Sequence, residues 1–270
     1  MFGHIHTVMN ALGAIGRFVV DKWRSTAYVA ALVFSVLLMA VKPRYWPRTV
    51  RDVLARQILF TGVEASRFIS MIALLAGVSI VVQAQVWLQR VGQIELLGPI
   101  LVAVVIREVG PLLTNFVVIG RSGSAIATEL GNMRVQGEVQ LLDAQGLDPF
   151  HYLVFPRVLG MMVSIFGLTV VFIVVCFVSG YVSGFLMGAN PGPPMFFIDS
   201  VLGAVEPRDV LAFLAKTLVP GLLTGAICCA EGMSVRGAVT EVPQATTRSL
   251  VRSVGALFIV SALISLVTYI

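Results

Sequence analysis

Long apolar runs with few or no charged residues alternate along this chain with short charged connections. An uncharged run of about twenty residues can cross a hydrocarbon core of ~30 Å as a helix. The pattern predicts an all-α membrane protein with five spanning helices, over residues 68–89, 96–120, 158–188, 210–230 and 254–270.

One earlier apolar run, residues 27–41, does not reach that length. Its fifteen residues rise only ~22 Å as a helix, which is short of a full crossing. Aromatic and basic residues flank the run, an arrangement typical of the membrane interface. We therefore expect an interfacial or re-entrant N-terminal element on the cytoplasmic face, with a sixth span as the alternative. The predicted organisation is an N-terminal element over residues 1–62 and a five-span domain over residues 63–270.

Composition supports a membrane protein over a soluble one. The chain is 57% hydrophobic and 12% charged, with a mean hydropathy of +0.93, whereas soluble domains carry about 25% charged residues. The formal net charge of +5 indicates cytoplasmic loops and anionic lipid headgroups, and we expect no nucleic-acid partner. The three cysteines lie in apolar stretches and suggest neither a disulfide framework nor a metal site.

The distribution of basic residues predicts how the chain is oriented. Nine Lys or Arg lie in residues 1–67, three in residues 120–157 and three in residues 231–253, whereas the two opposite connections hold only Arg90 and Arg208. Cytoplasmic loops carry an excess of basic residues. The connection between the second and third spans is therefore expected in the cytoplasm.

That cytoplasmic connection is unusually rich in charge. A helix is expected to follow Gly123, with Glu129, Arg134 and Glu138 on its polar side, and to end at Asp148 because the residue before a proline avoids helical geometry. We interpret this segment as a coupling helix that docks a soluble partner. The alternative is a surface helix whose charges are merely solvated.

Arg107 and Glu108 interrupt the second span near its middle. A charge at bilayer depth costs ~2.5–3.5 kcal/mol on the insertion scale, so such residues usually face protein or a water-filled cavity. One interpretation is a structural ion pair that fixes helix packing. The other, which we favour, is a polar lining for a substrate route, with contact to a lipid headgroup.

Small residues recur at helical spacing in the third and fourth spans. Gly180, Gly184 and Gly188 form a small-xxx-small ladder, and Gly221 and Gly225 repeat the spacing. Small residues let helices approach closely in lipid, so we interpret both sets as helix-packing positions. The sequence holds no P-loop, nucleophile elbow or HExxH motif. We therefore expect no catalytic residues, no metal and no cofactor in this chain.

A stretch of about fifty residues resembles a known family. The run REVGPLLTNFVVIGRSGSAIATELGNMRVQGEVQLLDAQGLDPFHYLVFPRVLG, together with the late QATTRSLV, is similar to the signature of the MlaE/YrbE permease family. The resemblance covers most of the chain from about residue 50 onward. Gly137 departs from it, because family members more often carry a helix-favouring residue there, and CCAEGMSVRG stands where an aromatic-rich pattern is commoner.

The resemblance implies the permease subunit of an ABC transporter in the bacterial inner membrane. Its partners would be a cytoplasmic ATPase that binds ATP and Mg, a periplasmic MCE-domain protein and a second permease copy, with a homodimer expected. Its substrates would be lipids, phospholipids above all. Matched by position, Arg107 and Glu108 would lie near the lipid cavity. Glu129, Met133, Arg134 and Glu138 would belong to the helix that docks on the ATPase.

Two other classes of function stay open at this point. A scaffold that anchors an MCE protein without transport would tolerate apolar residues at positions 107 and 108. A secondary transporter of small solutes would be expected to carry more ionisable residues at mid-membrane depth than this pair and Lys216.

Overall fold

The computed structural model describes residues 23–186 and 193–269, and all regular structure within them is helical. The first 22 residues of the expected N-terminal element, the expected end of the third span at Gly188, and Ile270 lie outside the described residues. The chain divides between Tyr45 and Trp46 into two compact units, which we describe separately.

The first unit contains a helix from Trp23 to Val41, followed by the short η1 helix Pro43–Tyr45. The long helix has 19 residues and therefore rises ~28 Å. The helix includes the polar residues that precede the apolar run, so it is longer than the run itself. By length and composition it can cross a membrane, which fits the alternative of a sixth span.

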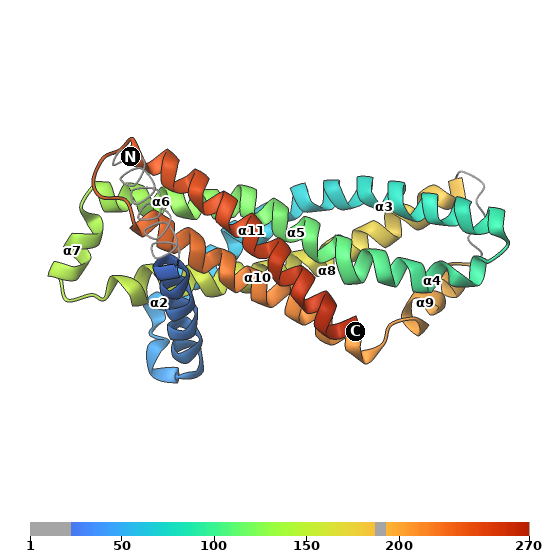
Figure 1. Cartoon of the computed structure of the whole chain (residues 1–270), viewed down its shortest axis with the longest axis horizontal. Helices are drawn as coiled ribbons and strands as arrows, with labels where there is room; N and C mark the ends of the chain where they lie inside the picture. Colours follow the sequence, from blue (N-terminus) through green and yellow to red (C-terminus); the bar gives the residue numbers. More distant parts are fainter. Residues whose placement is uncertain (1–22, 187–192, 270) are drawn as a thin grey trace, which may run out of the picture. The chain divides into compact units, whose positions relative to one another are not determined.

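The second unit contains five long helical stretches, and these confirm the five predicted spans (Figure 1). They cover Arg48–Val91, Leu97–Val135, Phe150–Leu186, Pro207–Met233 and Glu241–Tyr269. Each stretch extends beyond its predicted apolar run by at least three residues at one end or at both. The absence of charge marks the hydrocarbon-facing part of a helix, whereas the helix itself continues into polar sequence.

Three of these stretches contain π-helical segments, the third of them η6 (Phe150–Val154). The first stretch consists of α2 (Arg48–Ile58), η2 (Leu59–Val63) and α3 (Glu64–Val91). After η3 (Ile94–Leu96), the second consists of α4 (Leu97–Leu101), η4 (Val102–Val109), α5 (Gly110–Val118), η5 (Ile119–Gly123) and α6 (Ser124–Val135).

The remaining elements complete the unit in chain order. They are α7 (Glu138–Ala144), η6 (Phe150–Val154), α8 (Phe155–Leu186), α9 (Pro194–Gly203), α10 (Pro207–Met233) and α11 (Glu241–Tyr269). Helix α8 packs against α3 and α10, and α10 packs against α11.

Glycines set the close packing of α8 on its neighbours. A Cβ atom on Gly180 would lie 2.3 Å from Cβ of Val81 on α3, and a Cβ on Gly184 would overlap the side chain of Gln85. These contacts confirm that the ladder is a packing surface, here within one chain. The third glycine of the ladder, Gly188, lies outside the described residues.

The glycines of the fourth span also allow close helix packing. A Cβ atom on Gly225 would lie 2.9 Å from Cα of Val158, and one on Gly221 would lie 3.0 Å from Cα of Met162. Helix α10 therefore approaches the backbone of α8 at both glycines, which confirms the packing interpretation there too.

The two ends of this unit hold different short helices (Figure 1). At one end α9 packs on α4, so closely that a Cβ on Gly98 would lie 2.1 Å from the carbonyl oxygen of Ser200. At the other end α6 packs against α10 and α11, and α7 follows α6. The charge pattern predicts that the α6 end faces the cytoplasm.

The expected coupling helix consists of two helices. Its first part, α6, continues the second span without interruption, and its second part is the separate helix α7. The helix is interrupted at Gly137, which adopts φ +79°. A left-handed backbone suits glycine and ends a helix, so the residue that departs from the family pattern sits at the break.

Candidate functional site

A network of four charged side chains lies where the second span meets α10 and α11. Arg107 forms a bidentate ion pair with Asp209 on α10: Nη2 donates to Oδ2 at 3.0 Å, and Nε lies 2.8 Å from Oδ1. The Asp209 side chain is 0% exposed. Tyr269 on α11 completes this half, because its hydroxyl donates to Asp209 at 3.1 Å and its ring lies 4.8 Å from the guanidinium.

Glu108 belongs to the other half of the network. Its Oε1 accepts hydrogen bonds from Nζ of Lys216 at 2.5 Å and from the hydroxyl of Ser265 at 2.7 Å. Lys216 is 1% exposed in its side chain, whereas Glu108 is 41% exposed. Each cation is therefore paired with one carboxylate. The Asp209 carboxylate is buried, whereas the Glu108 carboxylate is partly exposed at the surface of the chain.

Two prolines leave backbone acceptors that this network uses. Pro111 has no N–H to donate to the carbonyl of Arg107, four residues earlier, and that oxygen accepts a hydrogen bond from Lys216 Nζ at 2.7 Å. Pro220 leaves the carbonyl of Lys216 in the same position, and Nδ2 of Asn115 donates to it at 3.3 Å. Freed backbone groups within a membrane need such partners. The backbone carbonyls that the two prolines leave without a donor thus belong to Arg107 and Lys216, two members of the charged network.

Asp209 also fixes the start of α10. It accepts a hydrogen bond from the backbone N–H of Glu206 at 3.0 Å, and Pro207 occupies the first turn, so the helix begins with a capping box. Asp209, which pairs with Arg107, is therefore itself fixed in place by the capping box at the start of α10. This pre-orders the carboxylate for a bidentate contact.

The structure places Arg107 and Glu108 together, but they do not pair with each other. Arg107 contacts one turn of α10 and Glu108 contacts another, so the pair joins three helices at two points. Glu108 Oε2 has no hydrogen-bond partner among the described residues. The half-exposed carboxylate therefore keeps one oxygen that can accept a hydrogen bond from a polar or cationic ligand group.

The four residues expected to dock a partner do not lie on one helix. Glu129 lies on α6, and it accepts a hydrogen bond at 2.7 Å from Arg157 of α8, whose side chain is 8% exposed. Met133 and Arg134 are partly buried in the last turns of α6, whereas Glu138 is exposed at the start of α7. The break at Gly137 separates Arg134 from Glu138.

Other contacts anchor α6 to the last two spans. Its Ile126, Ala127 and Leu130 are buried, and Thr128 shares a hydrogen bond of 2.9 Å with Thr246 of α11. Nearby, Glu231 at the end of α10 forms ion pairs with Arg248 and Arg252 of α11. Helix α6 is therefore joined by side-chain contacts to both α8 and α11.

Comparison with known proteins identifies the architecture. The family described as "Permease MlaE" matches residues 54–267. This chain belongs to the MlaE permease family.

Curated relatives of this MlaE permease carry related names. It is 29% identical over 254 residues to Protein TRIGALACTOSYLDIACYLGLYCEROL 1, chloroplastic, of Arabidopsis thaliana, an alignment that covers 91% of this chain and 70% of that protein. It is 26% identical over 247 residues to a probable ABC transporter permease protein of Rickettsia conorii, covering 91% and 93%. A probable ABC transporter permease protein of Synechocystis sp. is 37% identical over 171 residues, covering 62% and 63%. The chain is thus a multi-pass transmembrane permease subunit of the ABC transporter class.

Sequence reasoning missed most partners of the charged pair. Asp209 and Lys216 are seven residues apart, which places them on one face of α10 two turns apart. An acid and a base on one face of α10 can pair with Arg107 and Glu108 on another span. This spacing was the feature of the sequence from which the two ion pairs could have been predicted. Nothing in the sequence marks Tyr269 or Ser265, because their partners come from more than fifty residues away.

Proposed function

We propose that this MlaE permease moves lipids across or out of a bacterial inner membrane, with phospholipids as the main class. The observation that carries the proposal is the half-exposed Glu108 carboxylate beside Arg107, within a span that is otherwise apolar. A charged, hydrogen-bonding site surrounded by apolar helix surface matches an amphiphile, which has a polar headgroup and hydrocarbon chains. The name of the plant relative, which includes a diacylglycerol lipid, supports the same class.

The charged network suits a headgroup for a physical reason. Its four charges sum to zero, so it can stay in an apolar environment without attracting a permanent counter-ion. A phosphate-bearing headgroup can accept hydrogen bonds from the guanidinium, and an amine can donate to the open oxygen of Glu108. A zwitterionic headgroup would engage both without adding net charge.

The remaining partners belong to the same proposal. A cytoplasmic ATPase would dock on the end of α6 and on α7, where Met133, Arg134 and the exposed Glu138 lie. Glu129 would act through Arg157, passing the movement of α6 to α8. A periplasmic MCE-domain protein would accept or deliver the lipid, and a second permease copy would complete a homodimer.

The proposal is tested by the lipids that copurify with the protein. Wild type, Glu108→Gln and the control Glu95→Gln are extracted from native membranes in mild detergent, and bound lipids are measured by mass spectrometry. Glu95 is an exposed carboxylate in η3, outside the network. Removal of a charge-assisted hydrogen bond is expected to lower phospholipid retention about tenfold in Glu108→Gln alone. Equal retention in the three proteins, with all three folded, would count against the headgroup site.

A further inference from the structure

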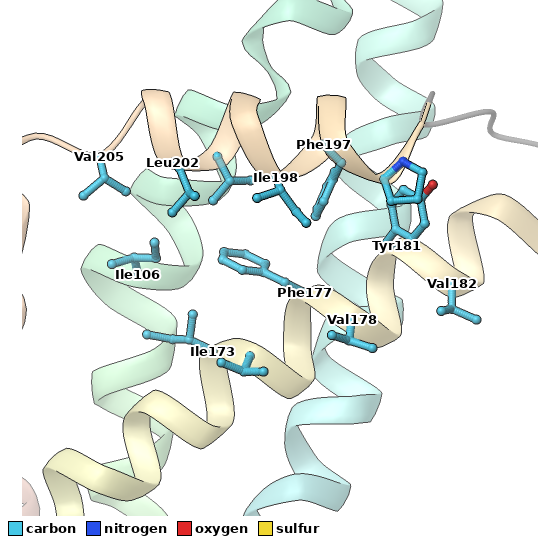
Figure 2. A pocket seen from close by; sticks show the side chains of 13 residues that line it. Ile106, Ile173, Phe177, Val178, Tyr181, Val182, Phe197, Ile198, Leu202 and Val205 are labelled. Atoms are coloured by element: carbon cyan, nitrogen blue, oxygen red, sulfur yellow. The ribbon is translucent and has the colours of Figure 1, made fainter.

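An apolar groove lies between α8 and α9, outside the charged network (Figure 2). Its volume is about 450 Å³. Residues of α8 line it at helical spacing, among them Ile173, Phe177 and Tyr181, and Phe197 of α9 faces them. The ring centroids of Phe177 and Phe197 lie 6.4 Å apart in an edge-on contact. Every lining residue is aliphatic or aromatic, so the groove offers a ligand no charged group.

The groove is open at the surface of the chain. Val178, Val182 and Leu202 line it and are themselves exposed. An apolar cavity of about 150 Å³ inside a protein stays dry and takes up small apolar molecules, and this groove is larger. Helix α8 belongs to the membrane-spanning stretch Phe150–Leu186 and α9 is a short apolar helix, so the apolar molecule available to the groove is a hydrocarbon chain.

One end of the groove adjoins the charged network. Ile106 lines the groove and directly precedes Arg107, and Val205 lines it just before Glu206 and Asp209. From this end the groove follows α8 from Ile173 to Val182, a rise of roughly 14 Å along the helix. A polar end followed by a straight apolar path matches one chain of an amphiphile.

We propose that the groove holds one acyl chain of the lipid whose headgroup lies at Arg107 and Glu108. The inference rests on the proposed lipid transport and adds the place where a tail is bound. The groove thus holds the hydrocarbon chain through close apolar contact, while the network selects for the headgroup. The occupant is the transported lipid, not a bulk lipid of the bilayer.

Photocrosslinking in lipid nanodiscs tests the inference with two probes that share one diazirine-bearing acyl chain. One probe is a phospholipid, and the other is a diacylglycerol without the phosphate headgroup. Mass spectrometry of the full-length permease maps the labelled peptides. The phospholipid is expected to label residues 173–182 and 194–205 about tenfold more than the diacylglycerol does, since only the phospholipid engages the charged network. Equal labelling by both probes would assign the groove to bulk lipid and overturn the inference, and so would an unlabelled groove.

Two matched variants localise the effect. Val178→Trp places a large ring in the groove, and Val163→Trp places the same ring at an exposed position of α8 outside it. Phospholipid labelling is expected to fall about tenfold in Val178→Trp, because the ring fills the space that the chain would occupy, and to stay unchanged in Val163→Trp. Unchanged labelling in Val178→Trp would overturn the inference.

Lipid transport is measured on the same preparations, which separates the two claims. If the wild-type protein transports lipid but is photolabelled outside the groove, the groove is not the acyl-chain site, and the proposed function is unaffected. A groove that is labelled by the phospholipid in a protein that moves no lipid would remove the proposed function together with the inference.

Discussion

The side-chain amide of Asn115 donates a hydrogen bond to the backbone carbonyl of Lys216 at 3.3 Å, across the interface between α5 and α10. That carbonyl lacks its usual helical donor because Pro220 has no N–H. The same amide donates to the carbonyl of Pro111 at 2.8 Å. Asn115 is fully buried, so its role is to satisfy the Lys216 carbonyl that Pro220 leaves without a donor in an apolar environment.

Replacement of Asn115 by Val should therefore destabilise the protein by about 1–3 kcal/mol, the usual cost of a buried acceptor left without a partner. The loss should be smaller in a Pro220→Ala background, because alanine restores an N–H that can bind the carbonyl of Lys216. Thermal unfolding of the single and double variants in detergent measures the coupling. Additive effects would mean that the proline and the amide act independently.

The ion pair of Lys216 with Glu108 predicts a separation of stability from function. Lys216→Met leaves the half-exposed Glu108 without its cation, and the loss should stay below the about 3–5 kcal/mol that removal of one partner of a fully buried pair costs. A second substitution, Glu108→Leu, should restore most of the thermal stability, since apolar replacements of whole pairs are well tolerated.

Lipid transport should not return in that double variant, because the headgroup site has lost its carboxylate. Thermal unfolding and transport are measured on the same preparation. Recovered transport alongside recovered stability would assign the pair a purely structural role.

The packing of α8 on α3 predicts different outcomes for two glycines of the same helix. Gly180→Ala would force a methyl group to within 2.3 Å of Val81 and should cost about 1–3 kcal/mol through overpacking. Gly167→Ala meets no atom within 4 Å and should be neutral or stabilising by up to about 1 kcal/mol, because alanine favours the helix. The two thermal midpoints check this directly; similar values would mean that the close approach does not limit stability.

The exposed Glu138 and the paired Glu129 predict two kinds of docking defect. Glu138→Lys should weaken copurification of the ATPase without a change in thermal stability, because the side chain is exposed on α7. Glu129→Lys should weaken copurification and also lower stability, since it places a cation against Arg157. Glu95→Lys, on the expected periplasmic side, is the control. Full ATPase recovery with Glu138→Lys would exclude this residue from the docking surface.

The spans of the second unit were predictable because each needs only local information. An uncharged run reports a hydrocarbon crossing wherever it occurs, and glycines at helical spacing report close packing. The helix Trp23–Val41 exceeds its apolar run because its first residues are polar. The break at Gly137 depends on one backbone conformation, which the apolar periodicity on either side of it conceals.

Only two residues of the charged network, Arg107 and Glu108, could be predicted from the sequence as a candidate site. Arg107 and Glu108 are conspicuous in an apolar span, but their partners are chosen by how α10 and α11 pack, which local sequence does not determine. The roles of Pro111 and Pro220 depend on the same packing, because a carbonyl freed by proline finds its donor on another helix. Glu129 illustrates the reverse case: its charge suggested an external partner, and the fold pairs it with Arg157.

ATP-driven transfer of a labelled phospholipid is the decisive test of the proposed lipid transport. The purified permease and its copurified ATPase are reconstituted in vesicles that carry the labelled lipid, and its release to an acceptor is followed with and without ATP. We expect transfer that requires ATP and that falls at least about tenfold in Glu108→Gln but not in Glu95→Gln. Equal transfer by wild type and Glu108→Gln, or no transfer by an assembled and ATP-hydrolysing complex, would contradict this expectation.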